Sequence, residues 1–240
     1  MTESRFGGLA AAAFASVTLC AVLAELVGGD PMLAFEIGAL AVATAWVRLA
    51  GLELVGSRRV LALLSADAHE ITLFGVSCRV TPVLGADAVV VGFIRPRIFV
   101  GPALIDALTD DELKAVMYHE DHHRRTRAPL RAAALGAWMR LLGRSSSVRD
   151  MMLARLADLE TLADGDAIRR GSSPVSIARA LLKGDLSPRP VAFSYAAERR
   201  VEHLLDRAAG RPAVSRVGLP VEWLPVVLVA GVALGCHLRF

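Results

Sequence analysis

The stretch of sequence that decides the fold and the chemistry is His119-Glu120-Asp121-His122-His123. It contains the pattern H-E-x-x-H, formed by His119, Glu120 and His123. Residues four apart lie on one face of a helix, so both imidazoles can reach the same metal ion. Glu120 then lies beside the open coordination position, where it can take a proton from a zinc-bound water and pass it to a leaving amine. The stretch therefore predicts a helix that carries a catalytic metal site, although a solvated helix rich in His and Arg would give the same letters.

The residues around this stretch predict where its helix begins and ends. Thr109 can cap the first turn, and Glu112 follows three residues later, as in a capping box. Pro129 limits the other end, because a proline disfavours helical geometry in the residue before it. We therefore expect a helix from about Asp110 to about Arg127.

A catalytic zinc ion usually has a third protein ligand, and the best candidate lies downstream. Glu160 and Asp164 are four residues apart in a segment with a helical pattern. Glu160 can bind the metal while Asp164 accepts a hydrogen bond from a ligand imidazole, which would fix the tautomer and orientation of that ring. A Glu and an Asp on an exposed helix face are also common. The rival third ligands are Asp150, Asp158 and His203.

The rest of the central segment predicts a small sheet followed by helices. Strands are expected within residues 80–100, where Val, Ile and Phe alternate with Gly and Pro. Further helices are expected at about 130–142, 148–170, 174–183 and 192–209. The fold class that follows is mainly α with a small β-sheet, an α+β domain.

The two ends of the chain have the composition of membrane helices. The 240-residue chain is 54% apolar, and this apolar content is concentrated at the ends. Candidate spans are residues 6–27, 32–55 and 219–238, each close to the 20 or so residues that cross a bilayer. A signal peptide is the alternative reading of the first span. We expect a transmembrane hairpin at 1–56, a working domain at 57–218 and a C-terminal transmembrane helix at 219–240.

Charge and cysteine content exclude other classes. The net charge of +3 comes without a basic stripe interleaved with aromatic residues, so no nucleic-acid partner is expected. The three cysteines form no C-x-x-C pair, and neither a disulfide framework nor a cysteine metal site is indicated. Arg58 and Arg59 follow the second span, while Asp30 lies in the preceding loop. The positive-inside rule then places the working domain in the cytoplasm, at the cell membrane.

Three motifs in order carry a resemblance to a known family. They are the segments 92–100 and 108–113, followed by His119-Glu120. Together they resemble the BlaR/MecR-type integral-membrane metallopeptidases and, more distantly, the HtpX-type membrane proteases. Both groups are gluzincins, in which H-E-x-x-H is joined by a downstream E-x-x-x-D, and Glu160 to Asp164 matches that second motif. The similarity covers about residues 80–205.

The resemblance implies roles for individual residues. His119, His123 and Glu160 would bind one zinc ion, Glu120 would be the general base, and Asp164 would hold a ligand histidine. A strand formed by Arg97, Ile98, Phe99, Val100 and Gly101 would be an edge that binds a peptide substrate by strand addition.

A later Arg-containing helix of the family resembles residues 198–205, with Arg200 aligned best. Arg200 would stabilise an oxyanion or hold Glu160, and a surface arginine is the alternative. Tyr195 and His203 are open candidates for substrate contact. The chain departs from the family pattern at Ala128, where relatives often have an acid, and at 130–142, which is too short to span a membrane.

The sequence therefore favours a membrane-anchored zinc endopeptidase whose partners are a protein or peptide substrate and the lipid bilayer. A non-catalytic membrane regulator or scaffold that keeps the fold is the second hypothesis. A metal-sensing membrane protein, based on the dense His122-His123 pair, is the third. The sequence indicates neither the substrate nor the oligomeric state.

Overall fold

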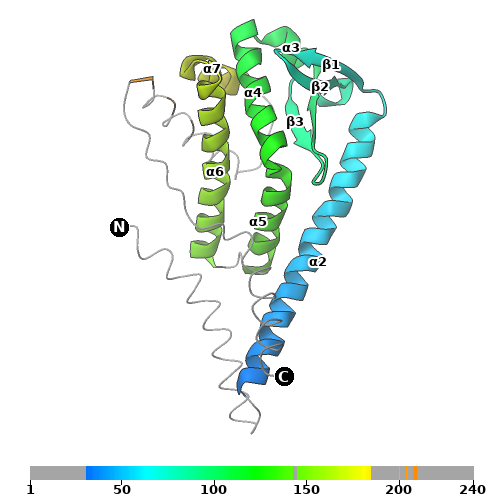
Figure 1. The fold of residues 1–240 in the computed structure, drawn as a ribbon, viewed down its shortest axis with the longest axis vertical. Helices are drawn as coiled ribbons and strands as arrows, with labels where there is room; N and C mark the ends of the chain where they lie inside the picture. Colours follow the sequence, from blue (N-terminus) through cyan, green and yellow to red (C-terminus); the bar gives the residue numbers. More distant parts are fainter. Residues whose placement is uncertain (1–30, 143–144, 185–199, 201–203, 205–207, 210–240) are drawn as a thin grey trace. The chain divides into compact units, whose positions relative to one another are not determined.

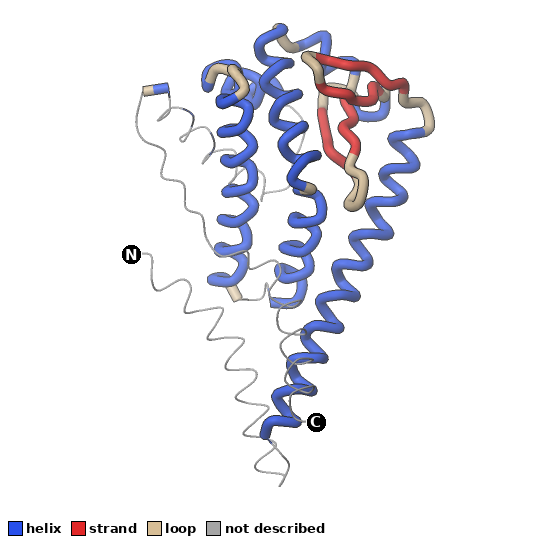
Figure 2. The backbone as a smooth tube through the Cα atoms, in the orientation of Figure 1, coloured by secondary structure: helices blue, strands red, loops and turns tan. Residues whose placement is uncertain are grey.

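The computed structural model describes residues 31–142, 145–184, 200, 204 and 208–209. Helices make up most of this part, with one small four-stranded sheet, which confirms the expected α+β class (Figures 1 and 2). The described residues fall into two compact units. Residues 31–52, 134–142 and 145–152 belong to the first, which we call the helical unit, and the others belong to the second, the site unit.

The sheet lies in the site unit and contains four short strands. They are β1 (His69–Leu73), β2 (Val76–Val80), β3 (Ala88–Val91) and β4 (Arg97–Val100). Their order is β1-β2-β4-β3, with β2 and β4 parallel and the other two pairs antiparallel. The β1–β2 hairpin was not expected from the sequence. Its two-residue turn, Phe74-Gly75, has positive φ at both positions, which matches the twist of paired strands.

The expectation that residues 97–101 form an edge strand is wrong. Strand β4 pairs with β2 on one side and with β3 on the other, so both of its edges are used. Ile98, Phe99 and Val100 are almost completely buried, and such a continuous apolar run is typical of a strand covered on both faces. Among the described strands the edges are β1 and β3, and β3 is the one beside the candidate site.

Both faces of the sheet carry apolar side chains that pack against helices. On one face, Ile98 and Val100 belong to a core cluster that includes Leu113 and Met117 of helix α4 (Asp110–Thr126). On the other face, Phe99 packs in a cluster with Leu64, near the end of helix α2 (Pro31–Ser65). The alternation of Ile98, Phe99 and Val100 between the two faces follows the two-residue period of a strand.

Helix α4 begins and ends where the sequence predicts. The Thr109 hydroxyl accepts a hydrogen bond from the Glu112 amide, and the Glu112 carboxylate accepts one from the Thr109 amide. At the other end, Arg127 adopts a left-handed conformation with φ of 52°, which stops the helix before Pro129. The two histidines of the motif therefore lie on the second half of a well-capped helix.

Three further helices agree closely with the expected ranges: α5 (Ala128–Leu142), α6 (Ser146–Arg169) and α7 (Pro174–Gly184). The short helix α3 (Pro102–Ala107) was not expected from the sequence. Helix α7 is tied to α4 by Lys183, whose Nζ lies 2.6 Å from Glu112 Oε2. The expected spans 6–27 and 219–238 lie outside the described residues, as does most of the expected helix 192–209.

Helix α2 is the one described helix that is long and apolar enough to cross a membrane, over Ile37–Ser65. It continues beyond residue 55, where the second span was expected to end. In the helical unit, Ala39, Ala43 and Trp46 form a buried face at intervals of three and four residues, and Trp46 Nε1 donates a hydrogen bond to Ala134 O. Apolar side chains elsewhere on α2 are exposed, among them Val47 at 60%.

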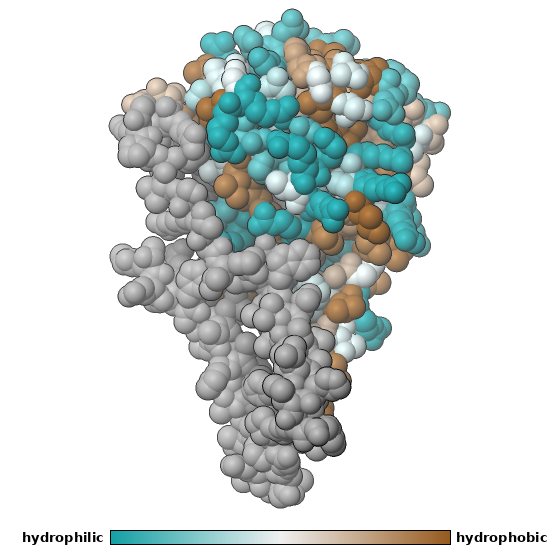
Figure 3. All heavy atoms as spheres, in the orientation of Figure 1, coloured by the Kyte–Doolittle hydropathy of each residue, from teal (hydrophilic) through white to brown (hydrophobic). Residues whose placement is uncertain are grey.

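Hydrophilic residues cover much of the described surface in the view of Figure 3, with hydrophobic residues between them.

Candidate metal centre

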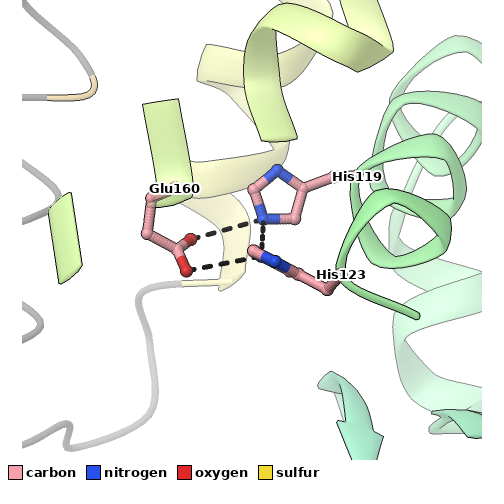
Figure 4. A group of neighbouring side chains, drawn as sticks. All are labelled: His119, His123 and Glu160. Carbon is pink, nitrogen blue, oxygen red and sulfur yellow. Dashed lines mark hydrogen bonds and ion pairs between the residues drawn. The ribbon is translucent and has the colours of Figure 1, made fainter. Parts of the chain in front are cut away.

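Three donor side chains from two helices converge in the site unit (Figure 4). His119 and His123 come from α4, and Glu160 comes from α6. The two Nε2 atoms lie 2.9 Å apart. Each faces one oxygen of Glu160 at 3.3 Å. One donor atom of each residue therefore lies within 4.8 Å of the others, and the group could hold a metal ion.

Asp164 fixes the orientation of one of these imidazoles. Its side chain is fully buried, and Oδ1 lies 2.8 Å from His119 Nδ1. When Nδ1 carries the proton and donates it to Asp164, the lone pair of His119 is on Nε2, the atom that faces His123 and Glu160. Asp164 lies one turn after Glu160 on α6, so a single helix supplies both carboxylates.

Arg200 holds both carboxylates in place. Its guanidinium donates to Asp164 twice, from Nε to Oδ2 at 2.9 Å and from Nη2 to Oδ1 at 2.7 Å. It also donates from Nη1 to Glu160 Oε2 at 3.0 Å. Of the two roles left open by the sequence, the structure therefore places Arg200 in the one that holds Glu160, and the surface alternative is wrong because its side chain is only 11% exposed.

These contacts keep the two carboxylates ionised despite burial. Burial alone would raise the pKa of Asp164, but Arg200 and the hydrogen bond with His119 outweigh it and lower the pKa to about 2. Burial acts in the same direction on Glu160, and the two histidines and Arg200 hold its pKa well below the usual range. Both carboxylates are therefore ionised at neutral pH, and Glu160 can offer a negative charge to a cation.

The pKa of His119 is shifted upward. Burial and the nearby Arg200 lower it, but hydrogen bonds with Asp164 and Glu160 outweigh them and raise the pKa to about 10. Without a metal ion, a proton on His119 therefore supplies the positive charge between the carboxylates. A metal ion bound there would replace that proton.

Glu120 lies next to His119 but belongs to no ion pair of the metal group. Burial raises the pKa of its carboxyl, and the cationic side chains nearby only partly offset this. Together with the three donor residues it lines a cavity of about 490 Å³. A carboxyl with a raised pKa beside a metal group, open to a cavity, has the placement of a general base.

The cavity lies between the sheet and the helices of the site unit. Strand β3 contributes Ala88, Val89 and Val90 to its lining, and Ala86 and Asp87 precede that strand. The other lining residues come from α3, α4, α5, α6 and α7, together with Arg200. The volume falls in the range of about 300–1,000 Å³ that is typical of ligand pockets. Ile177 and Leu181 of α7 also line the cavity, and the sequence did not predict this. The amphipathic pattern of residues 174–183 was the available signal, because it indicates that one face of the helix is covered.

The other polar residues of the motif belong to an ion-pair network outside the metal group. His122 Nδ1 lies 3.6 Å from Asp166, and Asp121 accepts hydrogen bonds from Arg124, Arg125 and Arg170. Arg125 also binds Asp166, so the network links α4 to α6. The His122-His123 pair is therefore divided between two environments, and only His123 faces the metal group.

The rival third ligands do not join this group among the described residues. Asp158 lies 3.6 Å from Arg155 of its own helix, and Asp150 is exposed. Tyr195 and His203 lie outside the described residues, and their expected roles stay predictions. His123 Nδ1 is buried and has no hydrogen-bond partner within the described part of the chain.

Compared with known proteins, the chain matches no family model, no curated protein and no solved structure. The site is therefore defined by its own geometry: two imidazoles, a carboxylate held by an arginine, and a second carboxyl at the cavity wall.

Proposed function

We propose that the chain is a membrane-anchored zinc-dependent endopeptidase of the gluzincin type, similar to the BlaR/MecR-type and HtpX-type enzymes. The observation that carries this proposal is the convergence of His119, His123 and Glu160 at the wall of a cavity that also exposes Glu120. Structural zinc sites usually have four protein ligands, whereas three protein ligands with an open position are typical of catalytic zinc.

The spacing of the donor atoms supports zinc. Zinc bonds to nitrogen and oxygen are close to 2.0–2.1 Å, so neighbouring ligands of a tetrahedral site lie about 3.3 Å apart. The two Nε2 atoms lie 2.9 Å apart, and each lies 3.3 Å from a different oxygen of Glu160, so a small rotation of the carboxylate brings one oxygen into that arrangement. Imidazole with carboxylate is also a donor set that zinc accepts. When bound, the ion would supply a Lewis acid that makes water nucleophilic near neutral pH.

Glu120 would move the proton in the reaction. It accepts a proton from the attacking water as the water oxygen bonds to the peptide carbonyl carbon, and it gives that proton to the amine as the C–N bond breaks. The raised pKa of Glu120 brings the carboxyl closer to neutral pH, where a general base that must also act as an acid works best. His119, held by Asp164, and Glu160, held by Arg200, would keep the metal ion fixed beside it.

A peptide substrate would bind along strand β3. This strand pairs with β4 on one side and lines the cavity, and it is an edge of the sheet among the described strands. An extended peptide can add to such an edge through main-chain hydrogen bonds, which places its carbonyl groups in a regular row beside the site. This replaces the edge that the sequence suggested at residues 97–101.

Helix α2 supports the membrane part of the proposal. Its segment Ile37–Ser65 has a mean hydropathy of 1.5 over its most apolar window. The substrate would then be a protein or peptide that reaches the cell membrane. Arg58 and Arg59 near the end of α2 favour a cytoplasmic site unit.

The proposal is tested with Glu120→Gln in the full chain, assayed on vesicles washed at alkaline pH. The amide has nearly the same shape but cannot take up a proton, so zinc content should stay unchanged while peptide cleavage falls by about 10²–10⁴-fold. Glu70→Gln, at an exposed position on β1, is the matched control and should keep full activity.

Cleavage that survives Glu120→Gln would contradict the assigned mechanism. A wild-type chain that binds zinc and stays in the washed vesicles but cleaves no peptide in a diverse peptide library would instead favour the non-catalytic scaffold. Loss of the chain from the washed vesicles would contradict the membrane anchor.

A further inference from the structure

The walls of the cavity beside the metal group are aliphatic. Apart from the metal group, Glu120, Arg200 and Asp87, every described residue that lines it is Ala, Val, Leu, Ile or Pro, so no hydroxyl, amide, Phe, Tyr or Trp side chain is among them. On α4, Val116 lies one turn before Glu120. From α7, Ile177 and Leu181 are one turn apart and contribute to the same lining.

The aliphatic lining continues past the other end of the metal group. Leu156 and Leu159 precede Glu160 on α6, and Pro129 and Ala132 follow α4 at the start of α5. Alanines recur in the lining, as at Ala88, where larger side chains would take up the space. The cavity is therefore roomy and apolar on both sides of the metal group along α4.

The charged groups in the lining leave little for a charged substrate side chain to bind. His119, His123 and Glu160 form the metal group, Glu120 lies beside it, and Arg200 already donates to Asp164 and Glu160. Asp87, the last, accepts a hydrogen bond from the amide of Ala88. A charged side chain that entered this cavity would lose its hydration without gaining a matching partner, whereas an aliphatic side chain would gain apolar contact.

We infer that the peptide substrate carries an aliphatic side chain, of the size of Val, Leu or Ile, on a residue that flanks the cleaved bond. The inference rests on the proposed function, because it is the zinc site that brings the cleaved bond next to this lining. It specifies the class of substrate: segments with an aliphatic residue at the cleavage site, and not segments in which both flanking residues are charged.

The inference can be tested without turnover. Peptide hydroxamates bind zinc through the hydroxamate group, so the adjacent side chain is held where a residue flanking the cleaved bond would lie. Two series, extending from the hydroxamate in opposite chain directions, would carry Leu, Asp or Lys at the adjacent position. Their affinities for the full, zinc-loaded chain in detergent micelles are measured by displacement of a fluorescent hydroxamate.

In at least one series the Leu compound should bind about tenfold or more tightly than the Asp and Lys compounds, because only Leu gains contact without an unpaired charge. Equal affinities within about threefold in both series, or a Lys or Asp compound that binds best in both, would overturn the inference. Absence of hydroxamate binding to a zinc-loaded chain would overturn it as well.

A charge placed in the lining should change the preference. Ala132 is exposed and lines the cavity, so Ala132→Lys adds an ammonium there with little cost to folding. The ratio of Leu to Asp affinity should fall about tenfold in this variant. Ala103→Lys, an equally exposed position on α3 outside the lining, is the matched control and should keep the wild-type ratio. The same ratio in both variants would place the substrate side chain elsewhere and overturn the inference.

The two proposals fail in different ways. A chain that prefers the Leu hydroxamate but cleaves no peptide would contradict the peptidase function alone. A chain that cleaves peptides at sites flanked equally by charged and aliphatic residues would contradict the substrate preference alone.

Discussion

At the scale of single residues, the site depends on one largely buried cation that holds a fully buried carboxylate and a partly buried one. Arg200 binds Asp164 with two hydrogen bonds and Glu160 with a third, and Asp164 in turn orients His119. The planar guanidinium matches this arrangement, whereas the single ammonium of a lysine cannot donate in the same fork. The metal group is therefore positioned by a residue that does not itself offer a metal ligand.

Replacing Arg200 should weaken both folding and metal binding. Arg200→Ala leaves Asp164 and Glu160 buried without their cation and should lower the free energy of unfolding by about 3–5 kcal/mol. Arg200→Lys should keep more of the stability but lower zinc affinity about 10–100-fold, the usual effect of losing a partner that orients a ligand. Denaturant unfolding and competition with a chelator measure the two effects. Arg179→Ala, at an exposed position on α7, is the control, and a loss as large as that of Arg200→Ala would contradict the account.

Metal binding should depend on pH because of His119. Its pKa in the metal-free chain is raised to about 10, so the imidazole holds a proton throughout the neutral range, and zinc must displace it. Zinc affinity should therefore rise with pH, by about tenfold per unit between roughly pH 6 and pH 8, with release of a proton on binding. Calorimetric titrations in two buffers of different ionisation enthalpy count that proton. A zinc affinity that is flat across this range, with no proton released, would contradict the raised pKa.

Residue-level prediction from sequence works where partners are close in the chain. His119 and His123 are recognisable as a pair because a helix brings residues four apart onto one face, and the same holds for Glu160 and Asp164. The contact between the two pairs spans about 40 residues. The need for a third ligand made Glu160 the best candidate among several, and the resemblance to a known family then favoured it over its rivals. The part played by Arg200, a further 36 residues from Asp164, depends on tertiary packing that no local pattern encodes.

At the scale of secondary structure, helix α4 carries most of the site, and its first turn is stabilised by the capping box of Thr109 and Glu112. Glu112 also binds Lys183 of α7, and this lowers the pKa of its buried carboxyl. Thr109 and Glu112 therefore fix the start of α4, which carries the histidines, and Glu112 also holds α7, which lines the cavity.

Thr109→Ala should destabilise the chain by about 1 kcal/mol, because the amide of Glu112 loses its acceptor at the helix start. Thr109→Ser keeps the hydroxyl and should recover most of that loss. The free energy of unfolding from denaturant titration measures both. An equal loss in the two variants would show that the hydroxyl does not stabilise the helix.

The helices were more predictable than the sheet. Caps, prolines and the break after residue 142 gave the bounds of α4 to α7 within a few residues. The sequence did not predict the hairpin of β1 and β2, because its turn is Phe74-Gly75 and not one of the common Asn-Gly or Asp-Gly pairs. The edge was assigned to the wrong strand because strand order is decided by pairing partners, which the sequence of β4 alone does not specify.

At the scale of the whole molecule, helix α2 is the described helix that is long and apolar enough to cross a membrane. Its first part lies in the helical unit and its last turns pack against the sheet through Leu64, so one continuous helix belongs to both units. Exposed apolar side chains such as Leu40, Val47 and Leu52 suit a lipid environment. If the proposed peptidase is anchored through α2, its substrates would be met at the membrane surface.

The measurement that tests the central claim most directly is the zinc content of the purified full chain, compared with His123→Ala and Glu160→Ala. The account predicts one zinc ion per wild-type chain and less than about a tenth of that in either variant, because each removes one of the three ligands found among the described residues. Lys114→Ala, on the same helix but outside the metal group, should keep the wild-type content. A wild-type chain that binds no zinc under conditions where it is folded, or variants that keep a full zinc ion, would contradict the assignment of this site.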